Sequence, residues 1–486
     1  MSKFRGLAEY EKPLGEGYRL LPFTFTSLKG DDYVLTNVAG EFMVLPRSDL
    51  NALVRHDLPY ASVAYKDLKS KHFLLDADST VGIDLLALKT RTKALNLGNF
   101  TGLHIFVVSL RCEHSCPYCQ VSRQSDDRVA YDMSAETAER ALEMVFRSPA
   151  KMLKIEFQGG EPLLNFERIR HIVLRAKEIN ETEKRDLEFV IATNLALLDD
   201  AVLSFCKEYE ILISTSLDGP ADLHNKNRPR PGKNSHQLAT DGIRRAQSVL
   251  GHDRVGALMT TTQASLPRVR DIIDEYLALG LNSIFLRPLS PYGFAIKTKT
   301  FASYDQSAWL QFFKDGLDYI LELNRNGHPV VEQYTATILT KMLTPWNPGY
   351  LDLRSPSGIG IGVLVYNYDG DLYASDEGRM LAEMGDKKFR LGNIHQDRYE
   401  DMILSDVLLD AIEESFTLSA PMCSDCAFEP FCGSEPVYHH ATQGDFVGKK
   451  PLSDFCKRNM AIFRHLVELM RSSSEVKEIF QSWALH

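Results

Sequence analysis

The first 111 residues of this 486-residue chain contain no cysteine, and no apolar run in the chain approaches the length of a membrane span. The opening segment Met-Ser-Lys-Phe-Arg-Gly lacks the features of a signal peptide. Basic residues are fewer than acidic ones, because 55 Lys and Arg against 65 Asp and Glu give a net charge of −10. These absences argue against a membrane protein, a secreted protein and a protein whose main partner is nucleic acid.

The length predicts two or three domains, and 44% hydrophobic residues can fill their cores. Eight cysteines without a secretion signal are typical of metal ligands in a reducing cytoplasm rather than of disulfides. Three of them lie between positions 112 and 119 and four between 423 and 456. Cys206 stands alone in a helical pattern and is expected to be a buried small side chain.

The first cysteine group follows the apolar run from His104 to Leu110. Its members are Cys112, Cys116 and Cys119, and a loop this short can aim three sulfurs at one point but cannot pair an odd number as disulfides. Gathered thiolates suit a soft metal or an iron–sulfur cluster. No fourth cysteine follows on the loop, so a [4Fe-4S] cluster there would keep one iron open for chemistry. The alternative is three cysteines that pack together or bind zinc structurally.

This Cys-x3-Cys-x2-Cys spacing, with Tyr118 before the last cysteine, resembles the signature of the radical S-adenosylmethionine (SAM) superfamily. The resemblance implies a [4Fe-4S] cluster on the three cysteines, with SAM chelating the open iron. It also implies that an electron from an external donor breaks SAM into methionine and a 5′-deoxyadenosyl radical, which removes a hydrogen from an unactivated carbon.

Strand-like and helix-like patterns alternate from residue 104 to about residue 288, which predicts an α/β fold with a partial (β/α)6 barrel over residues 99–300. One amphipathic helix is expected to begin at Ser134 and to end before Pro149. In such barrels, functional residues lie at the carboxyl ends of the strands. The strand candidates are His104–Leu110, Lys154–Gln158, Leu187–Thr193, Ile211–Leu217, Val255–Thr261 and Ser283–Arg287.

Motifs that resemble SAM-binding segments of the superfamily follow these strands. A Gly-Gly-Glu-Pro turn after the second strand is implied to bind the amino group of SAM, and two glycines let the backbone come close to a ligand. Leu195 stands where the family often has glycine, Asp218 is expected to fix a turn, and the alternative for Arg228 is an exposed surface cation. The SAM contacts implied by the resemblance are Tyr118, Gln158, Gly159, Gly160, Glu161, Asn194, Ser216 and Arg228.

Residues 1–98 are predicted to form a separate α+β module with a hairpin around Gly30 and a short helix after Ser48. This pattern resembles the winged-helix modules of peptide-modifying enzymes, which bind a leader peptide by strand addition. The alternative is a packing extension that shields the open bottom or side of the barrel. Residues 301–350 are expected to form a helical linker.

Residues 351–486 begin with a predicted hairpin around Asp369-Gly370 and end with the second cysteine group. The spacing of Cys423, Cys426, Cys432 and Cys456 resembles the outer cluster site of the SPASM extension. At the inner cluster's positions the chain has Ser375 and Pro436, and no cysteine precedes the hairpin. The resemblance therefore implies one auxiliary [4Fe-4S] cluster closed by four cysteines, and the alternative is a zinc ion in the same thiolates.

Asp376 follows Ser375 directly. In the sulfatase-maturing members that this region resembles, an Asp at the corresponding place is the proposed general base, so Asp376 is a candidate to accept a proton during substrate oxidation. The alternative is a solvated loop carboxylate.

Over nearly its full length the chain resembles the His-Xaa-Ser system radical SAM maturases, the HxsB family. That likeness includes the Tyr18-Arg-Leu-Leu-Pro-Phe segment and Cys432-Gly-Ser-Glu-Pro. It implies oxidation or cross-linking of a ribosomally made precursor peptide, at His or Ser side chains, with a second radical SAM subunit of the HxsC type as a heterodimer partner. The alternatives are a maturase of a folded protein, as in sulfatase maturation, and a non-catalytic peptide-binding subunit with structural metal sites.

Overall fold

The computed structural model describes residues 17–98 and 100–484, so the opening segment of the predicted N-terminal module lies outside the described residues. The fold is mixed α/β, as predicted, and is built around one eight-stranded sheet of order β10-β9-β8-β7-β6-β13-β14-β15. Strands β6 to β10 are all parallel. The strands are β6 (Leu103–Ser109), β7 (Met152–Gly159), β8 (Asp186–Thr193), β9 (Leu212–Ser216), β10 (Val255–Leu258), β13 (Val363–Tyr366), β14 (Asp371–Tyr373) and β15 (Arg390–Asn393).

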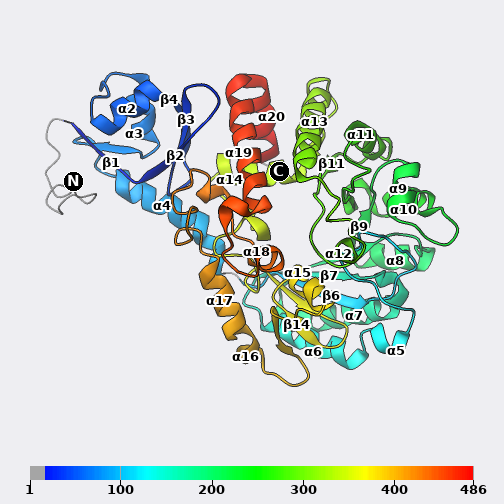
Figure 1. Cartoon of the computed structure of the whole chain (residues 1–486). Coiled ribbons are helices and arrows are strands. Elements are labelled where there is room, and N and C mark those ends of the chain that lie inside the picture. Colours follow the sequence, from blue (N-terminus) through cyan, green and yellow to red (C-terminus); the bar gives the residue numbers. More distant parts are fainter. Residues whose placement is uncertain (1–16, 99, 485–486) are drawn as a thin grey trace.

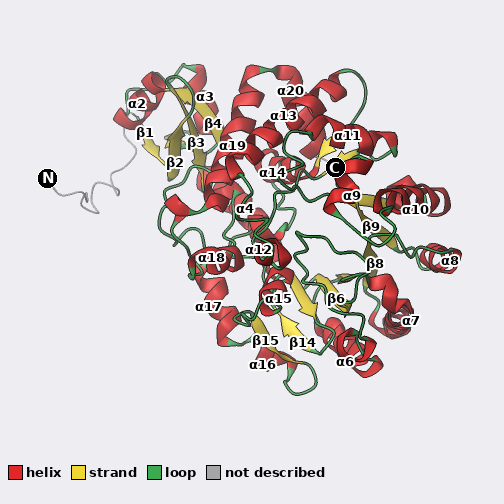
Figure 2. Cartoon of the chain, turned by 45° about the vertical axis from the view of Figure 1, so that its right-hand side comes forward, coloured by secondary structure: helices red, strands yellow, loops and turns green. Residues whose placement is uncertain are grey.

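Amphipathic helices cover the outer face of the parallel strands (Figure 2). Helix α6 begins after Ser134, whose hydroxyl oxygen accepts the N–H of Thr137, and it buries Ala138, Ala141 and Leu142 as its periodicity predicts. This packing leaves the carboxyl ends of the strands to the loops. The helices of this layer are α6 (Ala135–Arg147), α7 (Phe166–Glu183), α8 (Asp200–Glu208), α9 (Ala221–Asn227), α10 (Ser235–Leu250) and α11 (Val269–Ala278), and the short helix α5 (Arg128–Tyr131) lies outside it with no buried residue.

The sixth predicted strand differs from the expectation. Only Ser283–Ile284 forms a strand, β11, and it pairs with β12 (Val331–Glu332) in a separate two-stranded sheet. The carboxylate of Glu332 accepts the N–H of Leu286, and Pro288 has no N–H to donate, so regular pairing stops there.

The predicted C-terminal hairpin extends the barrel sheet instead of standing apart from it. Strand β13 pairs in parallel with β6 and antiparallel with β14, and Gly370 turns the chain at φ +86°. One continuous sheet therefore crosses the predicted boundary at residue 350.

The N-terminal module has a three-stranded antiparallel sheet, β2-β3-β4, and a two-stranded sheet, β1-β5. The predicted hairpin is present as β2 and β3, joined through Gly30 at φ +74°. In the helix after Ser48, Leu50 and Leu53 are buried, whereas Val54 is half-exposed. The elements are β1 (Tyr18–Leu20), β2 (Phe23–Ser27), β3 (Asp32–Asn37), β4 (Phe42–Pro46), α2 (Arg47–Arg55), α3 (Val63–Ser70), β5 (Leu74–Asp76) and α4 (Gly82–Ala94).

This module packs on the C-terminal extension, whose helices stand beside it in Figure 1. The Thr24 hydroxyl donates to the carbonyl oxygen of Cys426 at 3.2 Å, and Arg464 donates to the Thr26 hydroxyl at 2.9 Å. The residues predicted as a helical linker contain α13 (Gln306–Arg325) and α14 (Gln333–Leu343), and α12 (Phe294–Lys297) precedes them. The helices of the extension are α15 (Asp376–Ala382), α16 (Tyr399–Ile403), α17 (Asp406–Glu414), α18 (Pro436–Gln443), α19 (Asp454–Ser472) and α20 (Ser474–Ala484).

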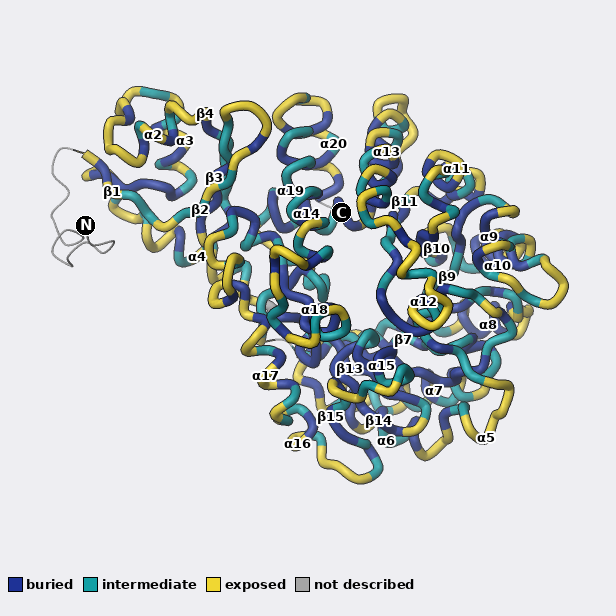
Figure 3. The backbone as a smooth tube through the Cα atoms, in the orientation of Figure 1, coloured by how far each residue is buried: buried dark blue, intermediate teal, exposed yellow. Residues whose placement is uncertain are grey.

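Burial follows the layers, with the strands and the inner faces of the helices dark in Figure 3. One continuous core joins the barrel to the helices of the extension. None of the helices in the described part of the chain is both long and apolar enough to cross a membrane.

Leu195, which replaces the family's usual glycine, adopts the left-handed conformation at φ +61° and is 2% exposed. Its side chain packs against Gly242 of α10, where a Cβ atom would lie 2.7 Å from the Leu195 Cβ. The glycine in one helix therefore makes room for the leucine in a neighbouring loop.

We expect Gly242→Ala to lower the free energy of unfolding by about 1–3 kcal/mol, because overpacking outweighs the gain in helix propensity. Urea unfolding of the metal-free chain measures this free energy of unfolding. Gly256→Ala in β10 is the control, since no atom lies within 4 Å of the added Cβ. Equal stabilities of the two variants would contradict the assigned packing.

Candidate cofactor and cluster sites

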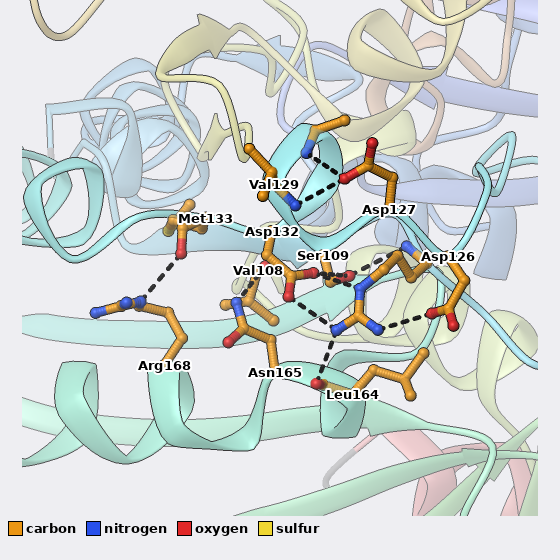
Figure 4. A network of polar contacts seen from close by, with 12 residues as sticks. Val108, Ser109, Asp126, Asp127, Val129, Asp132, Met133, Leu164, Asn165 and Arg168 are labelled. Atoms are coloured by element: carbon orange, nitrogen blue, oxygen red, sulfur yellow. Dashed lines mark hydrogen bonds and ion pairs between the residues drawn. The ribbon is translucent and has the colours of Figure 1, made fainter.

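The three-cysteine loop is anchored at its start by Arg111, whose side chain is 2% exposed. Its guanidinium donates to both carboxylate oxygens of Asp132 at 2.8 Å, to Asp126 at 2.9 Å and to the Leu164 carbonyl at 3.0 Å. Asp132 also accepts the Ser109 hydroxyl at 2.7 Å, and Figure 4 shows these partners around the end of β6. The position of the loop is thus fixed by the protein itself.

The Gly-Gly turn after β7 lies directly against the entry to this loop. The N–H of Gly160 donates to the Ser109 carbonyl at 2.8 Å, and that of Glu161 to the Arg111 carbonyl at 2.7 Å. A Cβ on Gly159 would lie 1.9 Å from the Ser109 oxygen, and one on Gly160 would lie 2.2 Å from the Arg111 oxygen. The closest neighbours of both glycines are therefore backbone atoms of the loop entry, where the sequence predicted a ligand.

The Glu161 carboxylate is fully buried and joins three elements. Oε1 accepts the Thr193 hydroxyl at 2.6 Å and the Leu163 N–H at 3.0 Å, while Oε2 accepts the Asn194 N–H at 2.9 Å. Burial, and next the charge of Glu113, raise the pKa of Glu161 to about 7. Binding of the SAM ammonium at this turn stays a prediction, and Oε2 keeps a lone pair that could serve it.

Asn194 connects this turn to the cysteine loop. Its side-chain amide donates to Glu113 Oε1 at 2.8 Å and lies 3.0 Å from His114 Nδ1. The N–H of His114 in turn donates to the Cys112 sulfur at 3.4 Å. Sequence reasoning missed Glu113 and His114, and their place between the first two cysteines was the available signal.

Tyr118, Asp218 and Arg228 form a second buried link. The Tyr118 hydroxyl donates to Asp218 Oδ2 at 2.6 Å, and Arg228 donates to both Asp218 oxygens at 3.0 and 3.2 Å. The Arg228 side chain is 14% exposed and lies over the Tyr118 ring, so it is not the exposed surface cation of the alternative. Asp218 also accepts the Thr260 N–H after β10, so its carboxylate joins neighbouring segments, whereas the sequence predicted that it fixes its own turn.

The three thiols themselves are half-buried at this end of the barrel. Burial raises the pKa of Cys116 to about 12, with Arg228 opposing the change, so metal binding must supply the charge that favours the thiolate. Three soft donors on one loop fit an iron–sulfur cluster with an open iron.

Gln158 and Ser216 lie at the ends of β7 and β9, at the same edge of the sheet. Their SAM contacts stay predictions.

The four C-terminal cysteines line one cavity of about 560 Å³, together with Phe25 and Thr26 of the N-terminal module. No three of their sulfurs lie within 4.8 Å of one another, whereas about 3.8 Å separates the sulfurs of a tetrahedral zinc site with 2.3 Å bonds. The wider spacing fits a [4Fe-4S] cluster, whereas the all-thiol donor set suits a cluster and zinc alike. Burial raises the pKa of Cys426 to about 11, and buried Lys341 donates to the Cys432 carbonyl at 3.0 Å.

The positions that lack the inner-cluster cysteines have structural roles. The Ser375 hydroxyl caps α15 by accepting the Gly378 N–H, and Pro436 occupies the first turn of α18. Both residues lie at the start of a helix, and neither role requires a metal.

Asp376 is the first residue of α15 and is 16% exposed, so it is not a solvated loop carboxylate. It accepts a hydrogen bond from Arg379 Nε at 3.1 Å, and the same guanidinium donates to the Val121 carbonyl at 3.2 Å. Val121 lies two residues after Cys119. The structure thus links Asp376 to the cysteine loop through one arginine, and its role as a base stays a prediction.

Comparison with known proteins identifies the barrel. Residues 106–262 match the radical SAM superfamily. The cysteine-type anaerobic sulfatase-maturating enzyme of Clostridium perfringens is 25% identical over 332 residues, which cover 66% of this chain and 84% of that protein. The matches to two other relatives cover only 62% and 40% of those proteins' own lengths.

Two solved structures share the fold. Native anSMEcpe with bound AdoMet and Kp18Cys peptide aligns with a TM-score of 0.62 and 20% identity, over 78% of this chain and 99% of that one. Streptococcus suis SuiB bound to precursor peptide SuiA aligns with a TM-score of 0.51 and 14% identity, over 87% and 96%. At these identities the likeness establishes the fold alone.

We expect Arg228→Met to lower the free energy of unfolding by about 3–5 kcal/mol, because it leaves the buried Asp218 carboxylate without its ion-pair partner. The control is Arg244→Met, which removes an exposed arginine paired with Asp241 at 3.6 Å and should change little. Urea unfolding of the metal-free chain, followed by near-UV circular dichroism, measures both. Similar losses of unfolding free energy in the two variants would show that the buried pair adds no more to stability than the exposed pair.

Proposed function

We propose that this chain, through the radical SAM domain of residues 106–262, is an enzyme that abstracts hydrogen from a ribosomally made precursor peptide to oxidise or cross-link it. The observation that carries the proposal is the junction at the carboxyl ends of β6 to β9. There the cysteine loop is bonded to the Gly-Gly-Glu turn, to Asn194 and to Asp218.

We assign Cys112, Cys116 and Cys119 to the SAM-binding [4Fe-4S] cluster. When bound, that cluster supplies the electron that converts SAM into methionine and a 5′-deoxyadenosyl radical. The chain's own residues would bind and orient SAM. In this proposal Gly159, Gly160 and Glu161 would hold the amino group, and Arg228 would neutralise the methionine carboxylate. The remaining contacts proposed for SAM are Tyr118, Gln158, Asn194 and Ser216.

We assign Cys423, Cys426, Cys432 and Cys456 to one auxiliary [4Fe-4S] cluster, which would supply an electron-transfer group with no open iron. Phe25 and Thr26 belong to the same cavity, so the N-terminal module would help to cover the cluster. In this proposal residues 1–98 are a winged-helix-like module that recognises a leader peptide, and strands β2 and β4 form the two edges of its three-stranded sheet.

A groove of about 1030 Å³ supports a peptide substrate. Its wall includes Ile296 of α12, and the N–H of Phe294 in the same helix donates to the Cys119 carbonyl at 2.7 Å. The groove continues past Leu381 and Met384 to Tyr438 of α18. An extended peptide lying there would pass beside α12, which is hydrogen-bonded to the cysteine loop. The HxsB resemblance favours a peptide with His-x-Ser repeats and an HxsC-like second subunit.

A folded sulfatase is the second candidate substrate. Two observations favour it: the alignment with the Clostridium perfringens enzyme covers 66% of this chain, and Asp376 is tied to the cysteine loop. In either reaction Asp376 would accept the proton released as the substrate radical is oxidised.

Anaerobic reconstitution of the full chain should give about eight irons, four for each cluster, and 5′-deoxyadenosine release that depends on dithionite. Cys119→Ala should lose about four irons and all SAM cleavage. Cys456→Ala should lose about four irons and keep SAM cleavage, since it changes only the auxiliary site. Iron analysis and chromatography measure both quantities.

Cys206→Ala is the matched control for these variants, because Cys206 is fully buried in α8, away from both groups. It should keep all the iron. Zinc in place of iron, with no SAM cleavage, would support the non-catalytic alternative instead.

Mass spectrometry of the chain co-expressed with a candidate precursor peptide should detect loss of two hydrogens from the peptide. Asp376→Asn should slow product formation about 100-fold or more while SAM cleavage continues, since general bases typically contribute 10²–10⁴-fold. Ser375→Ala, which removes only the cap of α15, is the control and should keep the product. An unchanged product yield in Asp376→Asn would assign this residue to pairing with Arg379 alone.

A further inference from the structure

A small cavity between the barrel and the C-terminal extension contains acidic groups that the proposed chemistry does not use. Its volume is about 60 Å³. Three carboxylates line it, from Asp352 before β13, Glu377 of α15 and Glu435 before α18. Two guanidiniums, from Arg287 and Arg458, also line it, so the fully ionised cavity carries an excess of negative charge.

The three carboxylates lack ion-pair partners. Among the residues that the structure describes, no basic nitrogen lies within 4.0 Å of Asp352, Glu377 or Glu435. Burial raises the pKa of each, and neighbouring carboxylates add to the effect for Glu377, which reaches about 7, and for Glu435. Asp352 accepts a hydrogen bond from Tyr350 and is influenced by Arg287 and Arg458 from beyond ion-pair distance, and Glu435 accepts the Tyr438 N–H at 2.6 Å. A cation in direct contact with these carboxylates would offset the remaining cost of their burial.

A second, independent observation comes from Trp309 of α13. Trp309 lines the same cavity, is 1% exposed, and its indole N–H has no acceptor. Buried donors in folded proteins are nearly always hydrogen-bonded. The cavity therefore lacks a cation in direct contact with its carboxylates and an acceptor for this N–H.

A metal ion could neither contact all three carboxylates nor accept a hydrogen bond from the Trp309 N–H. The carboxylate oxygens of Asp352, Glu377 and Glu435 do not all lie within 4.8 Å of one another, so they do not converge on one ion. An organic cation is larger and can reach separate carboxylates. A cavity needs about 10–15 Å³ to hold one water molecule, so a cavity of 60 Å³ has room for one charged head group.

We propose that this cavity binds the ammonium or guanidinium group of a basic residue in the peptide substrate, and that a carbonyl oxygen elsewhere in the same peptide accepts the Trp309 N–H. Tyr438 lines both this cavity and the 1030 Å³ groove, so a peptide in the groove would lie next to the cavity. The inference rests on the proposed function, because it names the residue type that the peptide must carry. It makes the cavity a specificity pocket for a basic side chain.

Calorimetric titration of the anaerobically reconstituted full chain tests it. N-acetyl-L-arginine N-methylamide should bind at least about tenfold more tightly than the citrulline analogue, which has the same shape and no charge. The double variant Asp352→Asn/Glu377→Gln should reduce this preference to less than about twofold. Equal binding of the two probes by the wild-type chain would overturn the proposal, whether or not the variant folds.

The control variant is Asp410→Asn/Glu413→Gln, which makes the same chemical changes at two exposed positions of α17 and should keep the preference. A cavity variant that retains the preference would also overturn the proposal. SAM cleavage measured on the same samples tests the proposed function separately from the cavity assignment. Its absence would refute the proposed function while a preference for arginine would still support the cavity assignment.

Discussion

The contact on which the site depends is the approach of two backbone segments at the ends of β6 and β7. The N–H groups of Gly160 and Glu161 reach the carbonyl oxygens of Ser109 and Arg111 at 2.8 and 2.7 Å, and neither glycine position has room for a Cβ. This junction places the Glu161 carboxylate under the end of β8, where Thr193 and Asn194 donate to it. The geometry of three strand ends therefore follows from one pair of glycines.

Two buried arginines complete the frame, each by neutralising a carboxylate that binds other groups as well. Arg111 pairs with Asp132 before the first cysteine, and Arg228 pairs with Asp218, which accepts the Tyr118 hydroxyl inside the loop. A buried ion pair adds little net stability, but it penalises any arrangement that separates its charges. Both ends of the cysteine loop are thereby fixed by contacts that do not require a metal.

The sequence predicted those features that leave a local pattern. The parallel strands, the start of α6 at Ser134 and the hairpin at Gly370 each have a periodicity, a cap or a turn residue, and all three are present. The extended run around Phe285 was a wrong prediction for the main sheet, because Glu332, far along the chain, takes the N–H of Leu286. Patterns within one segment cannot report a partner that arrives from another.

The same reasoning explains why the acidic cavity has no signature in the sequence. Its three carboxylates come from positions 352, 377 and 435, and each looks like an ordinary polar residue beside a turn or a helix start. They meet because β13 pairs with β6, which brings the extension onto the edge of the barrel sheet. That pairing makes residues 363–393 part of the barrel's own sheet, so the barrel and the extension share one folding unit.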